Sequence, residues 1–128
     1  MMRDDSTSPL RAPMPPVLGR DSYVGHPNPV TFELCGGGPS LGTLFWLGGS
    51  GQRPDNELIR RFCNALHAEG VTLTVHALHH ERGLRELPTR IEKTPGAVWL
   101  GGHSAGGGAA ATLIERVRVR GLVLINPC

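Results

Sequence analysis

Residues 97–117, "AVWLGGHSAGGGAAATLIERV", give the strongest indication of how this chain folds. Residues 97–100 form an apolar run of the kind found in buried strands, and residues 104–116 are long enough for a helix. Between them, "GHSAG" at residues 102–106 fits the pattern G-x-S-x-G. In that pattern a strand arrives, turns sharply at the serine and leaves as a helix. We therefore expect Ser104 to lie at a strained turn, with its hydroxyl projecting above a sheet.

The residues around Ser104 suit such a turn. Gly102 and Gly106 stand two residues before and two after it, where any larger side chain would clash with the turn. A helix that starts here brings its positive end to the serine, and the backbone N–H of Ala105 can then donate to an oxyanion. His103 occupies the first variable position of the pattern, and we interpret it as a packing residue rather than a base.

The chain before this stretch alternates apolar runs with glycine-rich turns. Residues 43–47, "TLFWL", are continuously apolar, as expected of a strand covered on both faces. Leu58, Phe62 and Leu66 recur at the spacing of one helix face, and Gly70 suits the end of that helix. The predicted strands are residues 30–34, 43–47, 71–78, 97–100 and 121–125, and the predicted helices are about residues 56–69, 84–92 and 104–116. This alternation predicts an α/β fold, a mostly parallel sheet with flanking helices.

Some segments depart from this regular pattern. Residues 1–29 are rich in proline and charge and are expected to form a flexible lead, which leaves residues 30–128 as one folded domain. Residues 79–83, "HHERG", are expected to form a loop. Pro88 argues against a regular helix in the segment that follows.

Composition narrows the class of protein. The net charge is +2 over 128 residues, and no basic cluster is interleaved with aromatic residues, so we expect no nucleic-acid partner. No apolar run approaches the ~18–20 residues of a membrane span. The three cysteines form no C-x-x-C pair, which favours reduced thiols in a cytoplasmic protein over a disulfide framework or a metal site. No cofactor is expected.

Three segments together resemble a known family. "TLFWLGGSG" (residues 43–51) resembles the strand and oxyanion loop of the α/β-hydrolases, and "GGHSAGG" (101–107) resembles their nucleophile elbow. "GLVLINP" (121–127) resembles the strand that comes next. The chain thus resembles the N-terminal half of an α/β-hydrolase, a partial hydrolase domain over residues 30–128.

The resemblance implies a role for each matching residue. Ser104 would be the nucleophile, and the N–H of Ala105, with that of Gly49 or Gly48, would form the oxyanion hole. The substrate would be a small molecule with an ester or related acyl bond. The family often has His-Gly after the earlier strand, whereas Leu47 precedes Gly48 here, so only the backbone donors carry over.

The partners of the serine are missing from the expected positions. In the family the chain order is nucleophile, acid and then base, yet Glu115 is the only carboxylate after Ser104 and no histidine follows. Asn126 stands near where some members carry the acid, but an amide cannot stabilise an imidazolium in the same way. We therefore expect an incomplete chain, from a truncated reading frame, an incomplete gene model or a split gene. Such a chain would be inactive or weakly active alone.

Upstream groups and other functions remain as alternatives. Substitutes for the missing base could come from the polar cluster at the end of the second long strand, namely His76, His79, His80 and Glu81. The apolar edge at residues 121–125 invites self-association, or partner binding by a non-catalytic relic of a hydrolase. Gly106, Gly108 and Ala111 satisfy the dinucleotide-binding pattern G-x-G-x-x-A, but Asn126 stands where that fold would place an acid.

Overall fold

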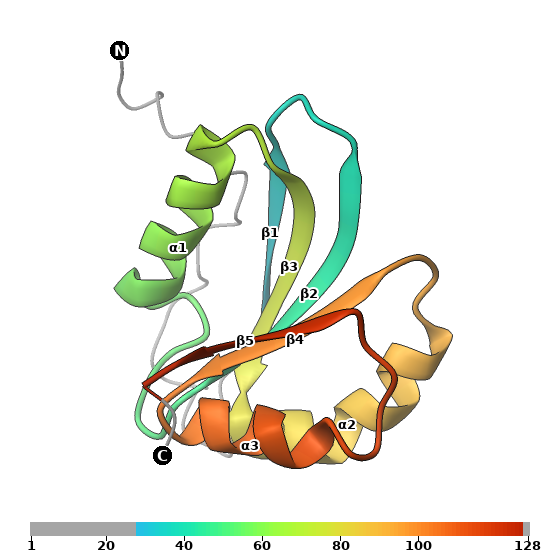
Figure 1. Ribbon diagram of the computed structural model, residues 1–128. Helices are drawn as coiled ribbons and strands as arrows, with labels where there is room; N and C mark the ends of the chain where they lie inside the picture. The colour runs from blue at the N-terminus through green and yellow to red at the C-terminus, as the bar shows by residue number, and fades with distance from the viewer. Residues whose placement is uncertain (1–27, 127–128) are drawn as a thin grey trace.

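The computed structural model describes residues 28–126, which form one five-stranded sheet and three helices (Figure 1). Nearly all of the expected lead, residues 1–29, lies outside the described residues. In chain order the elements are β1 (Val30–Cys35), β2 (Ser40–Gly48), α1 (Glu57–Ala68), β3 (Thr72–His79), α2 (His80–Lys93), β4 (Val98–His103), α3 (Ala105–Leu113) and β5 (Gly121–Ile125). The predicted α/β class with a mostly parallel sheet is confirmed.

The strand order creates a particular place in the sheet. The order is β1-β3-β2-β4-β5, and every neighbouring pair is parallel except β1 with β3. From β2 the chain moves to β3 on one side and then crosses back over β2 to reach β4 (Figure 1). The parallel strands β2 and β4 therefore lead to new strands on opposite sides of the sheet, β3 and β5, so the switch point lies between β2 and β4. Open α/β sheets bind their ligands at the carboxyl ends of strands at such a switch point.

Two apolar layers hold the sheet between its helices. On one face α1 covers a cluster that includes Trp46 of β2, which stacks on Phe62 with the ring centroids 5.3 Å apart. On the other face α2 and α3 cover a cluster that includes Phe45 and Leu47. Successive residues of β2 thus enter opposite layers, so β2 is the strand buried on both faces that its continuous apolar run predicts.

The helix α1 begins and ends as predicted. Asn56 is its N-cap, and the side-chain Oδ1 of Asn56 accepts a hydrogen bond of 3.3 Å from the N–H of Ile59. After the helix, Gly70 has a positive φ of 83°, a conformation that glycine adopts without steric cost.

The segment expected to be a loop is helical instead. Helix α2 begins at His80, and the ring of His79 caps it by accepting a hydrogen bond of 3.2 Å from the N–H of Glu81. Pro88 lies inside this helix, where it removes one backbone hydrogen bond. The helix forms nevertheless because its buried face, which includes Leu87 and Ile91, packs into the core.

Three further boundaries, the ends of β2, β4 and α3, differ from prediction. Strands β2 and β4 run on through Gly48 and through Gly101 and Gly102, because the ladders with their neighbours continue past these glycines. Helix α3 ends at Leu113, earlier than the predicted residue 116. The strand β4 consequently leads directly into Ser104.

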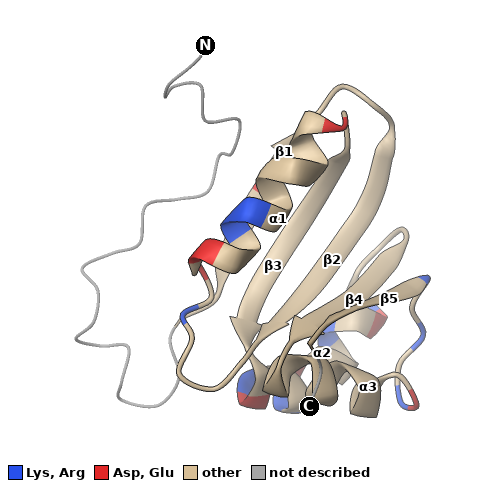
Figure 2. Cartoon of the chain, turned by 60° about the vertical axis from the view of Figure 1, so that its left-hand side comes forward, with Lys and Arg blue, Asp and Glu red and all other residues tan. Residues whose placement is uncertain are grey.

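The surface is mixed in charge, and one sheet edge is open. Figure 2 marks charged residues of both signs on α1, on α2 and in the turn before β5, while the strands are mostly uncharged. Among the described residues, strand β5 pairs with β4 alone, and its Leu122 and Leu124 are 37% and 36% exposed. Between residues 28 and 126, no helix is both long enough and apolar enough to cross a bilayer.

Candidate active site

Ser104 has an unusual backbone conformation. It stands between β4 and α3 with φ 58° and ψ −123°, a region that costs a residue with a side chain about 1–3 kcal/mol. Serine is a common helix N-cap because its hydroxyl can accept from the first turn, but the side chain of Ser104 makes no such capping bond. Helix capping therefore does not explain why a serine stands here.

The backbone on both sides of Ser104 is fixed. Its N–H donates to the carbonyl of Ile125 at 3.1 Å, the last residue of β5 and the neighbour of Asn126. Its carbonyl accepts from the N–H groups of Gly107 and Gly108 at 2.9 and 3.1 Å. The end of β5 and the first turn of α3 together hold the strained conformation in place.

The flanking glycines are required by contact distances. A Cβ at Gly102 would lie 2.8 Å from the nitrogen of Gly107 and would collide with the Gly106 carbonyl. A Cβ at Gly106 would lie 2.9 Å from the carbonyl oxygen of Gly48 and would collide with that of Leu47. The opposing atoms are backbone and cannot rotate away, so the expected need for minimal side chains at both positions is confirmed.

The loop after β2 packs directly against this turn. A Cβ at Gly49 would lie 3.3 Å from the Cβ of Ser104 and 3.2 Å from the carbonyl oxygen of His103. The structure thus brings Gly49 beside Ser104, as an oxyanion loop requires. The N–H of Gly49, however, already donates a 3.0 Å hydrogen bond to Oε1 of Gln52.

Gln52 is a site residue that the sequence reading missed. Its Oε1 also accepts from Nδ1 of His103 at 3.1 Å, and its own N–H donates to the carbonyl of Gly49 at 3.2 Å. His103 is therefore a hydrogen-bonding residue rather than a mere packing residue. The signal that could have found Gln52 is a side-chain acceptor three residues after a glycine in a tight turn.

Gly48 and Ala105, the other residues predicted to supply oxyanion N–H groups, also lie at the turn that holds Ser104. Gly48 ends β2, and its carbonyl accepts a hydrogen bond of 3.2 Å from Nδ1 of His80. Ala105 is the first residue of α3, and the first N–H groups of a helix have no acceptor within it. The positive end of α3 thus faces the turn that holds Ser104.

The three upstream histidines, His76, His79 and His80, make different contacts. His76 lies in the middle of β3, shares a 2.8 Å hydrogen bond with Thr31 and stacks on Phe45. Burial lowers its pKa, and the nearby Arg90 lowers it further, so this ring is neutral at pH 7. His79 stacks on His80 with centroids 4.3 Å apart. The ring of His80 hydrogen-bonds to the carbonyl of Gly48, next to the loop beside Ser104.

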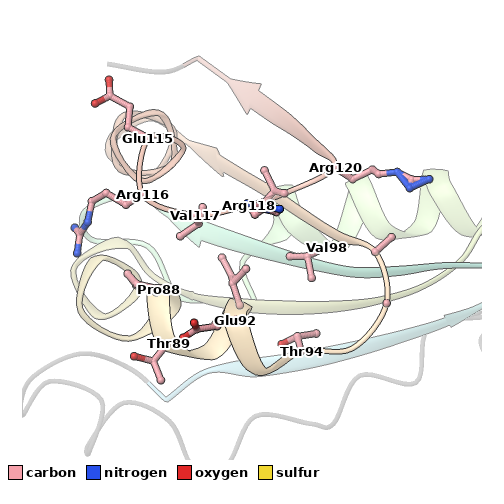
Figure 3. Close-up of a pocket in the computed structure, with 14 residues that line it drawn as sticks. Pro88, Thr89, Glu92, Thr94, Val98, Glu115, Arg116, Val117, Arg118 and Arg120 are labelled. Carbon is pink, nitrogen blue, oxygen red and sulfur yellow. The ribbon is translucent and has the colours of Figure 1, made fainter.

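A pocket lies at a distance from this site. The pocket, of about 1000 Å³, borders the amino end of β4, the opposite end of that strand from Ser104. Glu115, the one carboxylate after Ser104 in the sequence, is exposed, follows the end of α3 and borders this pocket rather than the turn of the serine. The side chains of Arg116 and Arg120 at its rim point in different directions (Figure 3).

The structure also bears on the other chemistries considered. Gly106 and Gly108 lie inside α3 rather than in a loop before it, so they do not form the phosphate-binding turn of a dinucleotide fold. Over residues 28–126 no three histidine, cysteine or acidic side chains are arranged to hold a metal ion. Cys63 is buried, which raises its pKa to about 12 and makes it a poor nucleophile.

No family model and no curated protein sequence matches this chain. The site is therefore defined by its own residues: the strained Ser104, the glycines that flank it, and the loop of Gly49 and Gln52.

Proposed function

We propose that this chain carries the nucleophile and the oxyanion hole of a serine hydrolase of the α/β-hydrolase type, acting on an ester or related acyl bond. The observation that carries the proposal is the backbone of Ser104, at φ 58° and ψ −123° between a parallel strand and a helix. A strained strand-to-helix turn is how this family exposes its nucleophile. The position at the switch point of the sheet supports the same function.

The chemistry follows from the groups at the turn. Oγ of Ser104 attacks the carbonyl carbon of the substrate as its hydroxyl proton passes to a base. The carbonyl oxygen becomes an oxyanion, which the N–H groups of Ala105 and Gly49 would stabilise. Collapse of this intermediate breaks the bond to the leaving alcohol and leaves an acyl group on Ser104. Water then attacks the acyl group and releases the acid.

Proton transfer is the weak part of this site. The sequence after Ser104 contains neither histidine nor aspartate, so no residue stands where the family places its acid and base. In serine hydrolases that lack a triad member, substrate binding and the oxyanion hole still give a rate about 10³–10⁴-fold above the uncatalysed reaction. We therefore expect slow hydrolysis by this chain alone.

The proposal is tested with p-nitrophenyl acetate. The wild-type chain should release p-nitrophenol faster than buffer does, and Ser104→Ala should reduce the rate to that of buffer. Ser50→Ala is the matched control, because Ser50 is exposed in the turn after β2, and it should keep the wild-type rate. Equal rates for wild type and a folded Ser104→Ala variant would refute the proposal.

The open edge supports a second candidate function, a non-catalytic fragment that associates through β5. Two half-exposed leucines, Leu122 and Leu124, lie on a strand with one free edge. Self-association should then appear in sedimentation velocity, and Leu124→Lys should abolish it. A monomeric wild-type chain would rule this function out.

A cytoplasmic location belongs to the same proposal. Cys35 and Cys63 are free thiols, and Cys35 is exposed. Exposed thiols persist in reducing compartments.

A further inference from the structure

We propose that the side chain of Gln52 occupies the oxyanion position when no substrate is bound, and that the substrate must displace it. This inference rests on the proposed function and adds a positioning residue that controls access to Ser104. It assigns to the loop after β2 a role beyond that of a passive backbone donor.

The side-chain carbonyl of Gln52 lies on one of the two N–H groups proposed to bind the oxyanion. Oε1 of Gln52 is 3.0 Å from the nitrogen of Gly49, and Gly49 packs against Ser104, with 3.3 Å between a Cβ built there and the Cβ of Ser104. An N–H group requires an acceptor, so the oxygen of the amide must face Gly49. This oxygen has the same chemistry as the carbonyl oxygen of an acyl substrate.

A second donor holds the side chain in place. Nδ1 of His103 donates to the same Oε1 at 3.1 Å. The backbone N–H of Gln52 donates to the carbonyl of Gly49, which closes the turn and keeps the side chain over the loop. Gln52 thus connects the residue before Ser104 with the loop that faces Ser104.

Displacement of Gln52 should be easier in the transition state than in the bound substrate. A neutral substrate carbonyl exchanges one neutral hydrogen bond for another, so it competes with Gln52 on nearly equal terms. A developing oxyanion makes charge-assisted hydrogen bonds, which are about twice as strong. The displacement therefore becomes favourable as charge develops, and binding energy is realised in the transition state rather than in the ground state.

The charge of the side chain is the variable to test. Gln52→Ala removes the internal acceptor and leaves the N–H of Gly49 open to a ligand. Gln52→Glu keeps the length and shape but places a carboxylate on the same donors. An anion there would resist displacement and would repel a developing negative charge.

The test is the rate at which a fluorophosphonate labels Ser104 in the full chain. In this reaction the Oγ–phosphorus bond forms, fluoride leaves and the hydroxyl proton is lost. We expect Gln52→Ala to react about fivefold faster than wild type, the factor that corresponds to one neutral hydrogen bond. Gln52→Glu should react at least about tenfold slower than wild type, as expected for a charge-assisted bond. Ser50→Ala, in the same turn, should match wild type.

A second measurement does not depend on reactivity. Hydrogen exchange of the Gly49 amide, followed by NMR, should be slow in wild type and Gln52→Glu and faster in Gln52→Ala. Equal exchange in all three proteins would overturn the inference, as would labelling of wild type that Gln52→Ala fails to accelerate. If no variant is labelled while Gly49 stays protected, the hydrolase proposal fails. Displacement by substrate then fails with it, and Gln52 is a turn residue only.

Discussion

The two ends of β4 differ in what they are built from. At the amino end the strand borders a pocket of about 1000 Å³, and Gly96, just before the strand, has no atom within 4 Å of where its Cβ would be. At the carboxyl end, Gly102 and Gly106 are pressed against backbone atoms, and Ser104 is held in a strained conformation. The amino end is therefore open, whereas the carboxyl end is crowded and holds Ser104, the proposed nucleophile, in a fixed geometry.

The contrast between the two ends shows why pocket volume alone is a poor guide to a candidate site. A hollow forms wherever neighbouring elements diverge, as α2 and the turn after α3 do around the pocket. Strain persists only where the surrounding contacts enforce it, and it concentrates at functional sites. In this chain, close packing and strain identify the candidate site better than volume does.

The largest predicted loss of stability comes from a larger side chain at the crowded carboxyl end of β4. Gly106→Ala places a methyl group against the carbonyls of Leu47 and Gly48, which cannot move without shifting β2. We expect a loss of about 3 kcal/mol or more in the free energy of unfolding, at the upper end of overpacking costs. Urea denaturation followed by circular dichroism measures this loss.

Gly96→Ala is the matched control at the open end. Its only cost is the positive φ of 81°, about 1–2 kcal/mol for a residue with a Cβ. A cost for Gly106→Ala no greater than that for Gly96→Ala would remove the contrast between the two ends.

A smaller effect of opposite sign is expected at the serine itself. Ser104→Gly relieves about 1–3 kcal/mol of backbone strain but adds freedom to the unfolded chain. The net result should be a stabilisation of about 1 kcal/mol, seen as a higher midpoint in thermal unfolding. Ser50→Gly, in the exposed turn after β2, should not stabilise the chain. Destabilisation by Ser104→Gly would mean that the backbone at this turn is not strained.

The smallest predicted effect is a pH dependence of stability that comes from His76, which lies outside the candidate site. Burial lowers the pKa of His76 in the folded state, so the unfolded chain binds a proton more readily. The contribution of His76 to stability is therefore present above pH 6.5 and is lost as the pH falls below it. His76→Gln should weaken this dependence in urea titrations at pH 5 and pH 7.5. An unchanged pH dependence would show that His76 is not the group responsible.

Much of this fold could be predicted because its signals are local. Continuous apolar runs mark the strands, and the small residues around Ser104 mark the turn after β4. The start of α2 escaped prediction because it depends on the ring of His79 acting as a cap and on burial that outweighs Pro88. The ends of β2 and β4 were not predicted, because a glycine after an apolar run usually indicates a turn. Only the pairing with neighbouring strands shows that Gly48, Gly101 and Gly102 belong to the sheet.

In the candidate site, too, residues with local signals could be predicted and those that depend on distant contacts could not. Ser104, Gly102 and Gly106 follow from a short pattern whose steric reasons are local. For Gln52, residue spacing could have indicated only the local contact with Gly49. Its contact with His103 joins residues 51 apart in the chain, at the ends of the neighbouring strands β2 and β4. Contacts between distant segments of the chain carry no signal in residue spacing.

The most direct test of the central claim is the site of covalent labelling. The native wild-type chain is treated with a fluorophosphonate, its intact mass is measured, and the modified peptide is sequenced by mass spectrometry. Ser104 should carry a single adduct, which disappears when the chain is unfolded in urea before treatment and persists in Arg118→Ala at the distant pocket. An unmodified native chain, or an adduct equally present after unfolding, would contradict the assignment of Ser104 as a nucleophile.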